Sequence, residues 1–239
     1  MRKRELGKRR TRPPGMVRRV LGLALVGMVL VILGGTTEMA MSGELRGTPS
    51  REELVAAVER GPGPGKGRED APVVLVEFSD FQCVYCRKFW QETLPKIEEQ
   101  YVRSGKVRFL YRHLAILGEA SVLAAQAAAC SHDQGRFWEY HDGLFRESSP
   151  LAFTTSRLKR YASQSGLDER AFTGCLDSGK HAERVEAETI LGRALGANAT
   201  PAFLINGQLL IGAYPFEVFQ QALDATLASP RRGPTSRTR

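Results

Sequence analysis

The sequence predicts an α/β fold in which a parallel sheet carries an inserted, all-helical subdomain. An apolar run at 73–78 precedes a helical pattern at 83–101 and a second strand pattern at 107–111. Strand, helix and strand in this order form a right-handed crossover unit with parallel strands. The pattern is then helical over 118–195, and strands return only at 202–211. At 239 residues the chain can hold one substantial domain with appendages.

The net charge of +8 comes from the two ends of the chain. Residues 1–19 carry nine of the 34 Lys and Arg residues against one Glu, and residues 231–239 carry four Arg and no acid. The remainder holds 21 basic and 25 acidic residues, so it is mildly acidic. We therefore expect no basic folded face and no nucleic-acid partner.

An apolar segment at 20–37 follows a basic region at 1–19, which we assign to the cytoplasm. The segment is long enough to cross a bilayer once as an anchor. The alternative is a signal peptide cleaved near Ala40-Met41-Ser42, and Met16 is an alternative start. Either interpretation places the body at the extracytoplasmic face of the membrane, or in a secreted or periplasmic form, where disulfides persist. A buried soluble helix is disfavoured because the arginines stop abruptly at the apolar boundary.

Residues 38–70 are predicted to be a linker that contains one short helix. Ser50 and Glu53 are three residues apart at its start, which is the capping-box pattern. The Gly- and Pro-rich stretch 61–67 is predicted to form neither helix nor strand. The compact domain is therefore expected to begin near Ala71.

The first part of that domain is predicted over 71–117. The run 73–78 is broken only by Glu77, which is typical of a central strand buried on both faces. Apolar residues then recur at helical spacing from 83 to 101, and Pro95 predicts a kink in this helix.

A helical insertion is predicted over 118–196 and the second part of the sheet domain over 197–228. The hairpin 202–211 turns at Asn206-Gly207, the strongest two-residue turn signal. The Pro-, Arg- and Ser-rich tail 229–239 is predicted to be disordered. The expected helices lie at 121–130, 137–145, 155–164, 168–177, 180–195 and 216–227.

Cys83-Val84-Tyr85-Cys86 directly follows the first strand and begins the first helix. Two thiols at this spacing can form a disulfide, and the helix start favours the thiolate of the first. This is the requirement for thiol–disulfide exchange. The alternatives are a structural disulfide or half of a zinc site. Zinc needs about four ligands, and the sequence has no second C-x-x-C, so we expect no metal and no cofactor.

The segment Glu77–Cys86 resembles the active-site segment of DsbA-like thiol–disulfide oxidoreductases. The segment Thr200–Gly207 resembles the cis-proline loop and following hairpin of the same family, and the helical insertion is similar to the family's insertion. The resemblance spans roughly 71–228. It implies a thioredoxin fold with an inserted all-helical subdomain, here preceded by a single transmembrane or signal segment.

The resemblance implies a role for each site residue. Cys83 is the expected exposed nucleophile and Cys86 the buried, resolving partner. Glu77 is the expected buried proton carrier, for which a raised pKa is suitable; the alternative is an edge-facing glutamate in a salt bridge. Pro201 is expected to be cis and to pack against the disulfide, and Thr200 to contact substrate and tune the thiolate. The alternative for Pro201 is a proline that merely ends a loop.

Cys130 and Cys175 both lie in the insertion. Their even number and the oxidising compartment favour pairing, and some relatives carry a second, structural disulfide. The bridge would close a loop of about 45 residues and contribute about 4 kcal/mol in the chain-entropy model. Two separately buried thiols and a second, electron-relaying redox pair are the alternatives.

The expected function is the formation of disulfides in exported proteins. A membrane protein of the DsbB or VKOR type is the expected redox partner, and reduced or misfolded exported proteins are the expected substrates. Val84 and Tyr85, between the two cysteines, replace the Pro-His of the family's archetypal oxidant, so a less extreme oxidant is expected. A reductase or isomerase on the same fold is the first alternative. A non-enzymatic binding module or chaperone, with C-x-x-C as a structural bridge, is the second.

The remaining aromatic and histidine residues are expected to be structural. His113, His132, His141 and His181 are assigned to ordinary surface or interface packing, and Phe81, Phe137, Trp138 and Phe145 to the core. Phe81 is also a candidate for lining a substrate groove.

Overall fold

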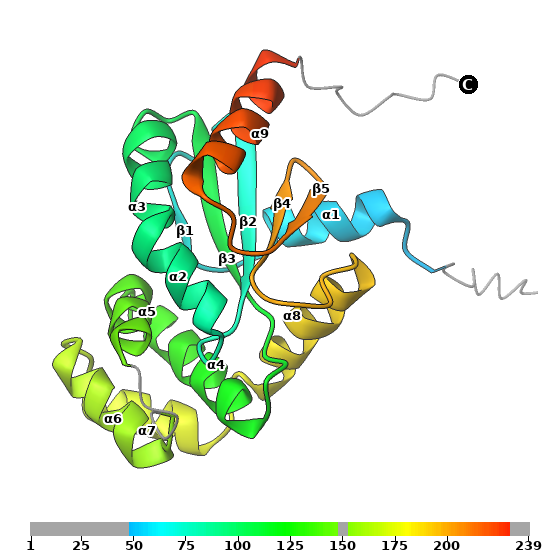
Figure 1. Ribbon diagram of the computed structural model, residues 1–239. Helices are drawn as coiled ribbons and strands as arrows, with labels where there is room; N and C mark the ends of the chain where they lie inside the picture. Colours follow the sequence, from blue (N-terminus) through cyan, green and yellow to red (C-terminus); the bar gives the residue numbers. More distant parts are fainter. Residues whose placement is uncertain (1–47, 148–152, 230–239) are drawn as a thin grey trace, which may run out of the picture. The chain divides into compact units, whose positions relative to one another are not determined.

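The computed structural model describes residues 48–147 and 153–229, which form a five-stranded sheet covered by helices (Figure 1). The strand order is β1-β3-β2-β4-β5, with β2 and β3 parallel and the other pairs antiparallel. The predicted parallel crossover unit and the hairpin are confirmed. The strands are β1 Gly65–Lys66, β2 Val73–Ser79, β3 Val107–His113, β4 Ala202–Ile205 and β5 Gln208–Ile211.

Several sequence predictions lie outside the described residues. These are the basic region 1–19, the apolar segment 20–37 with the cleavage site and Met16, and the tail from 230 onwards. Within 48–147 and 153–229, no helix is long and apolar enough to cross a membrane.

The helix that begins after Cys83 is interrupted where Pro95 predicts a kink. Helix α2 ends at Glu92, with Thr93 as its C-cap, and α3 follows with Pro95 in its first turn, where no intrahelical hydrogen bond needs the missing N–H. A π-helical turn, η1 Glu98–Val102, completes the segment. The helices are α1 Arg51–Arg60, α2 Val84–Glu92, α3 Leu94–Ile97, α4 Glu119–His132, α5 Phe137–Arg146, α6 Thr155–Gln164, α7 Glu169–Asp177, α8 Ala182–Ala194 and α9 Phe216–Ala228.

Each face of the sheet has its own apolar core. Helices α2, α3 and α9 cover one face, where the ring of Phe89 lies 4.5 Å from that of Phe203 and 5.3 Å from that of Phe219. Helices α1 and α8 cover the other face, which contains Val58 and Phe78. Because side chains alternate along β2, its odd-numbered residues face α2 and its even-numbered residues face α1 and α8.

Helices α4 to α7 gather at one end of the sheet around a third apolar core (Figure 1). This core reaches from Phe172 in α7 to Phe81, Cys83 and Cys86 at the start of α2. The insertion therefore supplies part of the wall around the two cysteines.

The prediction that residues 61–67 form no strand was wrong. Gly65 and Lys66 pair with Leu110 and Phe109 of β3. A Cβ on Gly65 would meet the Leu110 side chain at 2.8 Å, so this edge position admits only glycine without rearrangement. The expectation that the compact domain begins near Ala71 was also wrong.

Arg112 is the physical reason why the segment before Ala71 is folded. Its side chain lies in the even-numbered face of β3 and is 3% exposed. The guanidinium donates hydrogen bonds to the carbonyls of Val58 at 2.6 Å and Gly61 at 2.8 Å, at the end of α1, and to that of Tyr111 at 3.0 Å. Charge-assisted bonds of this kind fix α1 to the sheet.

Replacing Arg112 with Met should lower the free energy of unfolding by roughly 3 kcal/mol, because buried carbonyls of α1 lose their donor. Arg108→Met is the matched control on the same strand, since Arg108 pairs with the exposed Glu69 at 3.4 Å. That change should cost no more than about 0.5 kcal/mol. Denaturant unfolding measures both values. Equal costs for the two variants would contradict this role of Arg112.

Candidate active site

Cys83 and Cys86 occupy different positions at the start of α2. Cys83 is the N-cap residue, and its Sγ accepts a hydrogen bond from the backbone N–H of Cys86 at 3.4 Å. Cys86 lies one turn inside the helix. Both are free thiols. Cys86 is completely buried, and Cys83 is 7% exposed, less than the exposed sulfur that we expected.

The loop before β4 faces Cys83 and accounts for this low exposure. The Thr200–Pro201 peptide bond is cis, as the resemblance implies. The Cys83 thiol donates to the carbonyl of Thr200 at 3.2 Å. Because β4 pairs with β2 in the register Phe78↔Ala202, the loop reaches the end of β2 where α2 begins. A peptide that contacts Cys83 must therefore approach beside Thr200.

The surroundings separate the pKa values of the two thiols. The pKa of Cys83 is lowered to about 6, first because the Cys86 thiol donates to its thiolate and then because the Thr200 side chain and the N–H groups of Cys86 and Tyr85 donate. Partial burial opposes this shift. Burial raises the pKa of Cys86 well above its ordinary value, and the negative charges of Cys83 and Glu77 raise it further. Cys83 is therefore a thiolate at neutral pH, whereas Cys86 keeps its proton.

Glu77 lies on the α2 side of the central strand β2 and is 1% exposed. Burial raises the pKa of its carboxyl to about 8. The alternative of an edge-facing glutamate in a salt bridge does not apply, since β2 is central and Glu77 makes no ion pair with any described residue. A neutral carboxyl near Cys86 can give or take a proton near neutral pH.

Asp80 is a residue of the site that the sequence analysis missed. Its carboxylate accepts bonds from the N–H of Gln82 at 2.8 Å and the hydroxyl of Ser121 at 2.6 Å. It also accepts from the N–H groups of Ile116 and Leu117 at 3.0 and 3.2 Å. Asp80 thus ties the loop before Cys83 to the loop after β3. The Asx-turn spacing to Gln82 is the signal that could have revealed it.

The structure corrects the assignment of several ring residues. His113 and His141 are each 1% exposed and His181 is 8% exposed, so these three are core residues rather than surface ones. Phe81 is 1% exposed and stacks on Tyr111 with ring centres 5.7 Å apart, so it does not line an open groove. The assignment of Phe137 and Phe145 to the core is confirmed. Trp138 is half-buried and packs against that core.

Val84 and Tyr85, by contrast, are 65% and 62% exposed. They form the accessible rim of the site, and neither side chain encloses a sulfur.

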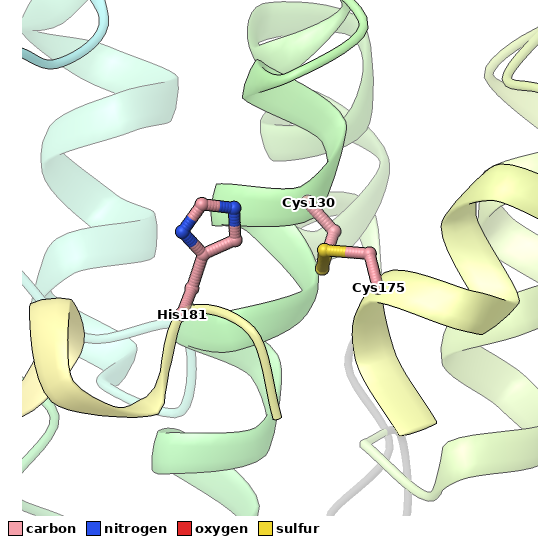
Figure 2. Close-up of side chains that lie close together, drawn as sticks. All are labelled: Cys130, Cys175 and His181. Atoms are coloured by element: carbon pink, nitrogen blue, oxygen red, sulfur yellow. A yellow bond between two sulfur atoms is a disulfide. The ribbon is translucent and has the colours of Figure 1, made fainter. Parts of the chain in front are cut away.

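Cys130 of α4 and Cys175 of α7 form the expected disulfide, with Cα atoms 5.9 Å apart (Figure 2). His181 lies beside it, and its Nε2 is 2.8 Å from a carboxylate oxygen of Asp133. Two cysteines and a histidine could in principle bind a metal, and their ligand atoms lie within 4.8 Å of one another. Sulfur atoms bonded to each other are not thiolate ligands, so the closed disulfide is not a metal site.

Comparison with known proteins places this geometry in a family. Residues 60–225 match the family model described as Thioredoxin. "Probable disulfide bond formation protein D" from Bacillus anthracis is 30% identical over 169 residues, which cover 67% of this chain and 76% of that protein. The chain belongs to the DsbA-like group of the thioredoxin family. The crystal structure of oxidised BdbD from Bacillus subtilis superimposes with a TM-score of 0.65 at 26% identity, covering 70% of this chain and 94% of that one.

A relative of another kind shares only this domain. "Na(+)/H(+) antiporter NhaA 3" from Salinispora tropica is 32% identical over 171 residues, which cover 71% of this chain. The chain spans 25% of the length of that protein. The DsbA-like domain is thus also similar to part of a much longer sequence.

The buried Glu77 predicts a specific dependence of stability on pH. The pKa of its carboxyl is about 8 in the folded state against an ordinary 4.5, so the folded protein keeps a proton that the unfolded chain loses. The stabilisation by this group is complete below pH 4.5 and is lost as pH rises to 8. The free energy of unfolding of the wild type should fall relative to Glu77→Gln by on the order of 5 kcal/mol across this window.

Urea unfolding at several pH values measures this difference, and both proteins are studied with their cysteines reduced, which is the state to which this pKa applies. Glu92→Gln, exposed on α2, is the control and should differ from the wild type by a constant amount. A constant difference for Glu77→Gln as well would contradict the raised pKa.

Proposed function

We propose that this protein is an extracytoplasmic thiol–disulfide oxidoreductase that forms disulfides in exported proteins through the Cys83–Cys86 couple. The observation that carries the proposal is the unequal environment of the two sulfurs. Cys83 is slightly accessible with a pKa of about 6, whereas Cys86 is buried with a raised pKa. This asymmetry assigns attack to one sulfur and release to the other.

In the proposed reaction, a substrate thiolate attacks Cys83 Sγ of the oxidised protein. A substrate–Cys83 bond forms, the Cys83–Cys86 bond breaks, and Cys86 leaves with the electron pair. Glu77 supplies the proton that Cys86 takes up. The second thiolate of the substrate then attacks the substrate sulfur of the mixed disulfide, and Cys83 leaves as a thiolate. The substrate is oxidised by two electrons and the protein couple is reduced.

The environment of Cys83 favours oxidation of substrates over their reduction. A lowered pKa stabilises the reduced protein, because the thiolate exists only after the disulfide opens. The relatives named disulfide bond formation protein D support this direction. Val84 and Tyr85 add no positive charge, so we place this couple among milder oxidants than those with a histidine between the cysteines.

We further propose that a membrane quinone-linked protein of the DsbB or VKOR type reoxidises the couple. The apolar segment 20–37 supports a location at the extracytoplasmic face, as an anchored or a cleaved form. The exposed rim of Val84 and Tyr85 beside Thr200 provides the approach for an unfolded substrate strand. The Cys130–Cys175 bridge is proposed to stabilise the insertion without exchanging electrons.

Oxidative refolding of a reduced, unfolded disulfide protein tests this function. Cys83→Ser should lower the rate of disulfide formation at least a hundredfold, to the uncatalysed level, because the attacked sulfur is removed. Cys86→Ser keeps that sulfur; once oxidised glutathione has converted Cys83 to its glutathione mixed disulfide, a substrate thiolate can displace glutathione, and one-to-one substrate adducts should accumulate because no Cys86 thiol is present to resolve them. Full activity of Cys83→Ser would contradict the enzyme and support a binding module.

A further inference from the structure

Behind the two thiols lies a group of buried polar atoms, of which the reaction above uses only Glu77. Glu77 Oε1, Ser79 Oγ and the Tyr111 hydroxyl each lack a hydrogen-bond partner of normal geometry among the described residues. All three residues are 1% exposed. An unpaired buried polar group costs about 1–3 kcal/mol. Three such groups together indicate a function that requires them rather than a packing accident.

The strands bring these atoms to the same side as Cys86. Glu77 and Ser79 are two residues apart on β2, so both face α2. Tyr111 is paired with Glu77 in the parallel register of β2 and β3 and shares that face. Tyr111 and Cys86 belong to the same buried cluster. The carboxyl, both hydroxyls and the inner thiol therefore lie on the same side of the sheet.

Ser79 interacts with each of its titratable neighbours. Burial raises the pKa values of Glu77, Cys86 and Tyr111, and in all three cases the Ser79 hydroxyl opposes the rise because it can donate to the anion. The same hydroxyl can also accept a proton through its oxygen. Tyr111 stays protonated, since the negative charges of Glu77 and Cys86 further disfavour its anion. Its hydroxyl therefore always carries a proton that it can donate in a hydrogen bond to Ser79 or Glu77.

We propose that Ser79 is a catalytic residue that passes the proton between Glu77 and Cys86, and that Tyr111 is a positioning residue that holds the Ser79 hydroxyl in place. The inference rests on the proposed function, whose protonation step it details. As Cys86 leaves, the Ser79 O–H bond breaks toward the Cys86 sulfur, and the Glu77 proton moves to Ser79 Oγ. Cys86 becomes a thiol, Glu77 a carboxylate, and Ser79 is unchanged.

Other titratable groups near this site are committed elsewhere or stay neutral. The Asp80 oxygens already accept four hydrogen bonds. Burial lowers the pKa of His113 to about 4 and lowers that of His141, so both rings are neutral at physiological pH. Cys83 is bonded to the substrate at this step. Glu77 therefore remains the acid on the inner side of the couple.

The test is the single-turnover reaction of the oxidised full-length protein with reduced glutathione, followed by stopped flow at several pH values. Ionisation of the glutathione thiol changes the rates of wild type and variant by the same factor, so it cancels in the ratio of the two rates. Glu77 can give a proton only below its pKa of about 8. Ser79→Ala should therefore react about tenfold more slowly at low pH, where Glu77 is protonated, and at the wild-type rate at high pH, where Glu77 is a carboxylate. Ser79→Thr, which keeps the hydroxyl, should restore the rate.

Matched controls separate the relay from loss of a buried hydroxyl. Ser131→Ala and Tyr140→Phe remove hydroxyls that bond to backbone carbonyls within the insertion, and both should react like the wild type. Tyr111→Phe should slow the reaction only in the low-pH window. If Ser79→Ala does not fold, the pH dependence of the Tyr111→Phe rate tests the relay by itself. The double variant Ser79→Ala/Glu77→Gln should be no slower than Glu77→Gln alone, because both changes interrupt one path.

Slowing that is equal at all pH values, or additive with Glu77→Gln, would overturn the relay and make Ser79 a structural residue. An unchanged rate for both Ser79→Ala and Tyr111→Phe would overturn it as well. A wild-type protein that does not react with glutathione at Cys83 would instead overturn the proposed function, so the two failures are distinct.

Discussion

The structure depends on how the Cys83 sulfur is held at the junction of α2 and the cis-proline loop. The sulfur accepts the N–H of Cys86 and contacts the carbonyl of Thr200. Each contact depends on the position of another part of the chain. The first needs α2 to begin at residue 84, and the second needs β4 to pair with β2 in its observed register. The sheet and the first helix together therefore determine the chemistry of one atom.

The central strand β2 divides structural from chemical roles between its two faces. Its even-numbered side packs against α1 and α8 through residues such as Phe78 and Val76. Its odd-numbered side begins as apolar core at Val73 and Leu75 and then becomes polar at Glu77 and Ser79. A carboxyl and a hydroxyl in this position destabilise the fold. We interpret that cost as the consequence of supplying a proton to a buried thiol.

Much of the fold was predictable because its signals are local. The capping box at Ser50 and Glu53 is present in the structure, and a helix break falls where Pro95 indicates it. The C-x-x-C at a helix start and the Asn206-Gly207 turn are also short-range patterns. The cis-proline was predicted by the family resemblance alone.

Apart from Asp80, whose turn to Gln82 is local, the features that were missed depend on contacts between distant segments. Strand β1 has two residues and forms through backbone bonds, so it leaves no side-chain pattern. The docking of α1 through Arg112 joins residues more than 50 positions apart. The placement of Tyr111 beside Glu77 follows from the strand register. Register is not visible in a single sequence until the partner strand is known.

The central claim is that the environment of Cys83 makes the couple an oxidant, and the reduction potential of the Cys83–Cys86 pair tests it most directly. Equilibration with glutathione buffers of known ratio gives this value. The stabilised Cys83 thiolate predicts a potential more oxidising than the roughly −270 mV of thioredoxin, though below the roughly −120 mV of the strongest oxidants of the family. A potential at or below that of thioredoxin would contradict the account and indicate a reductase.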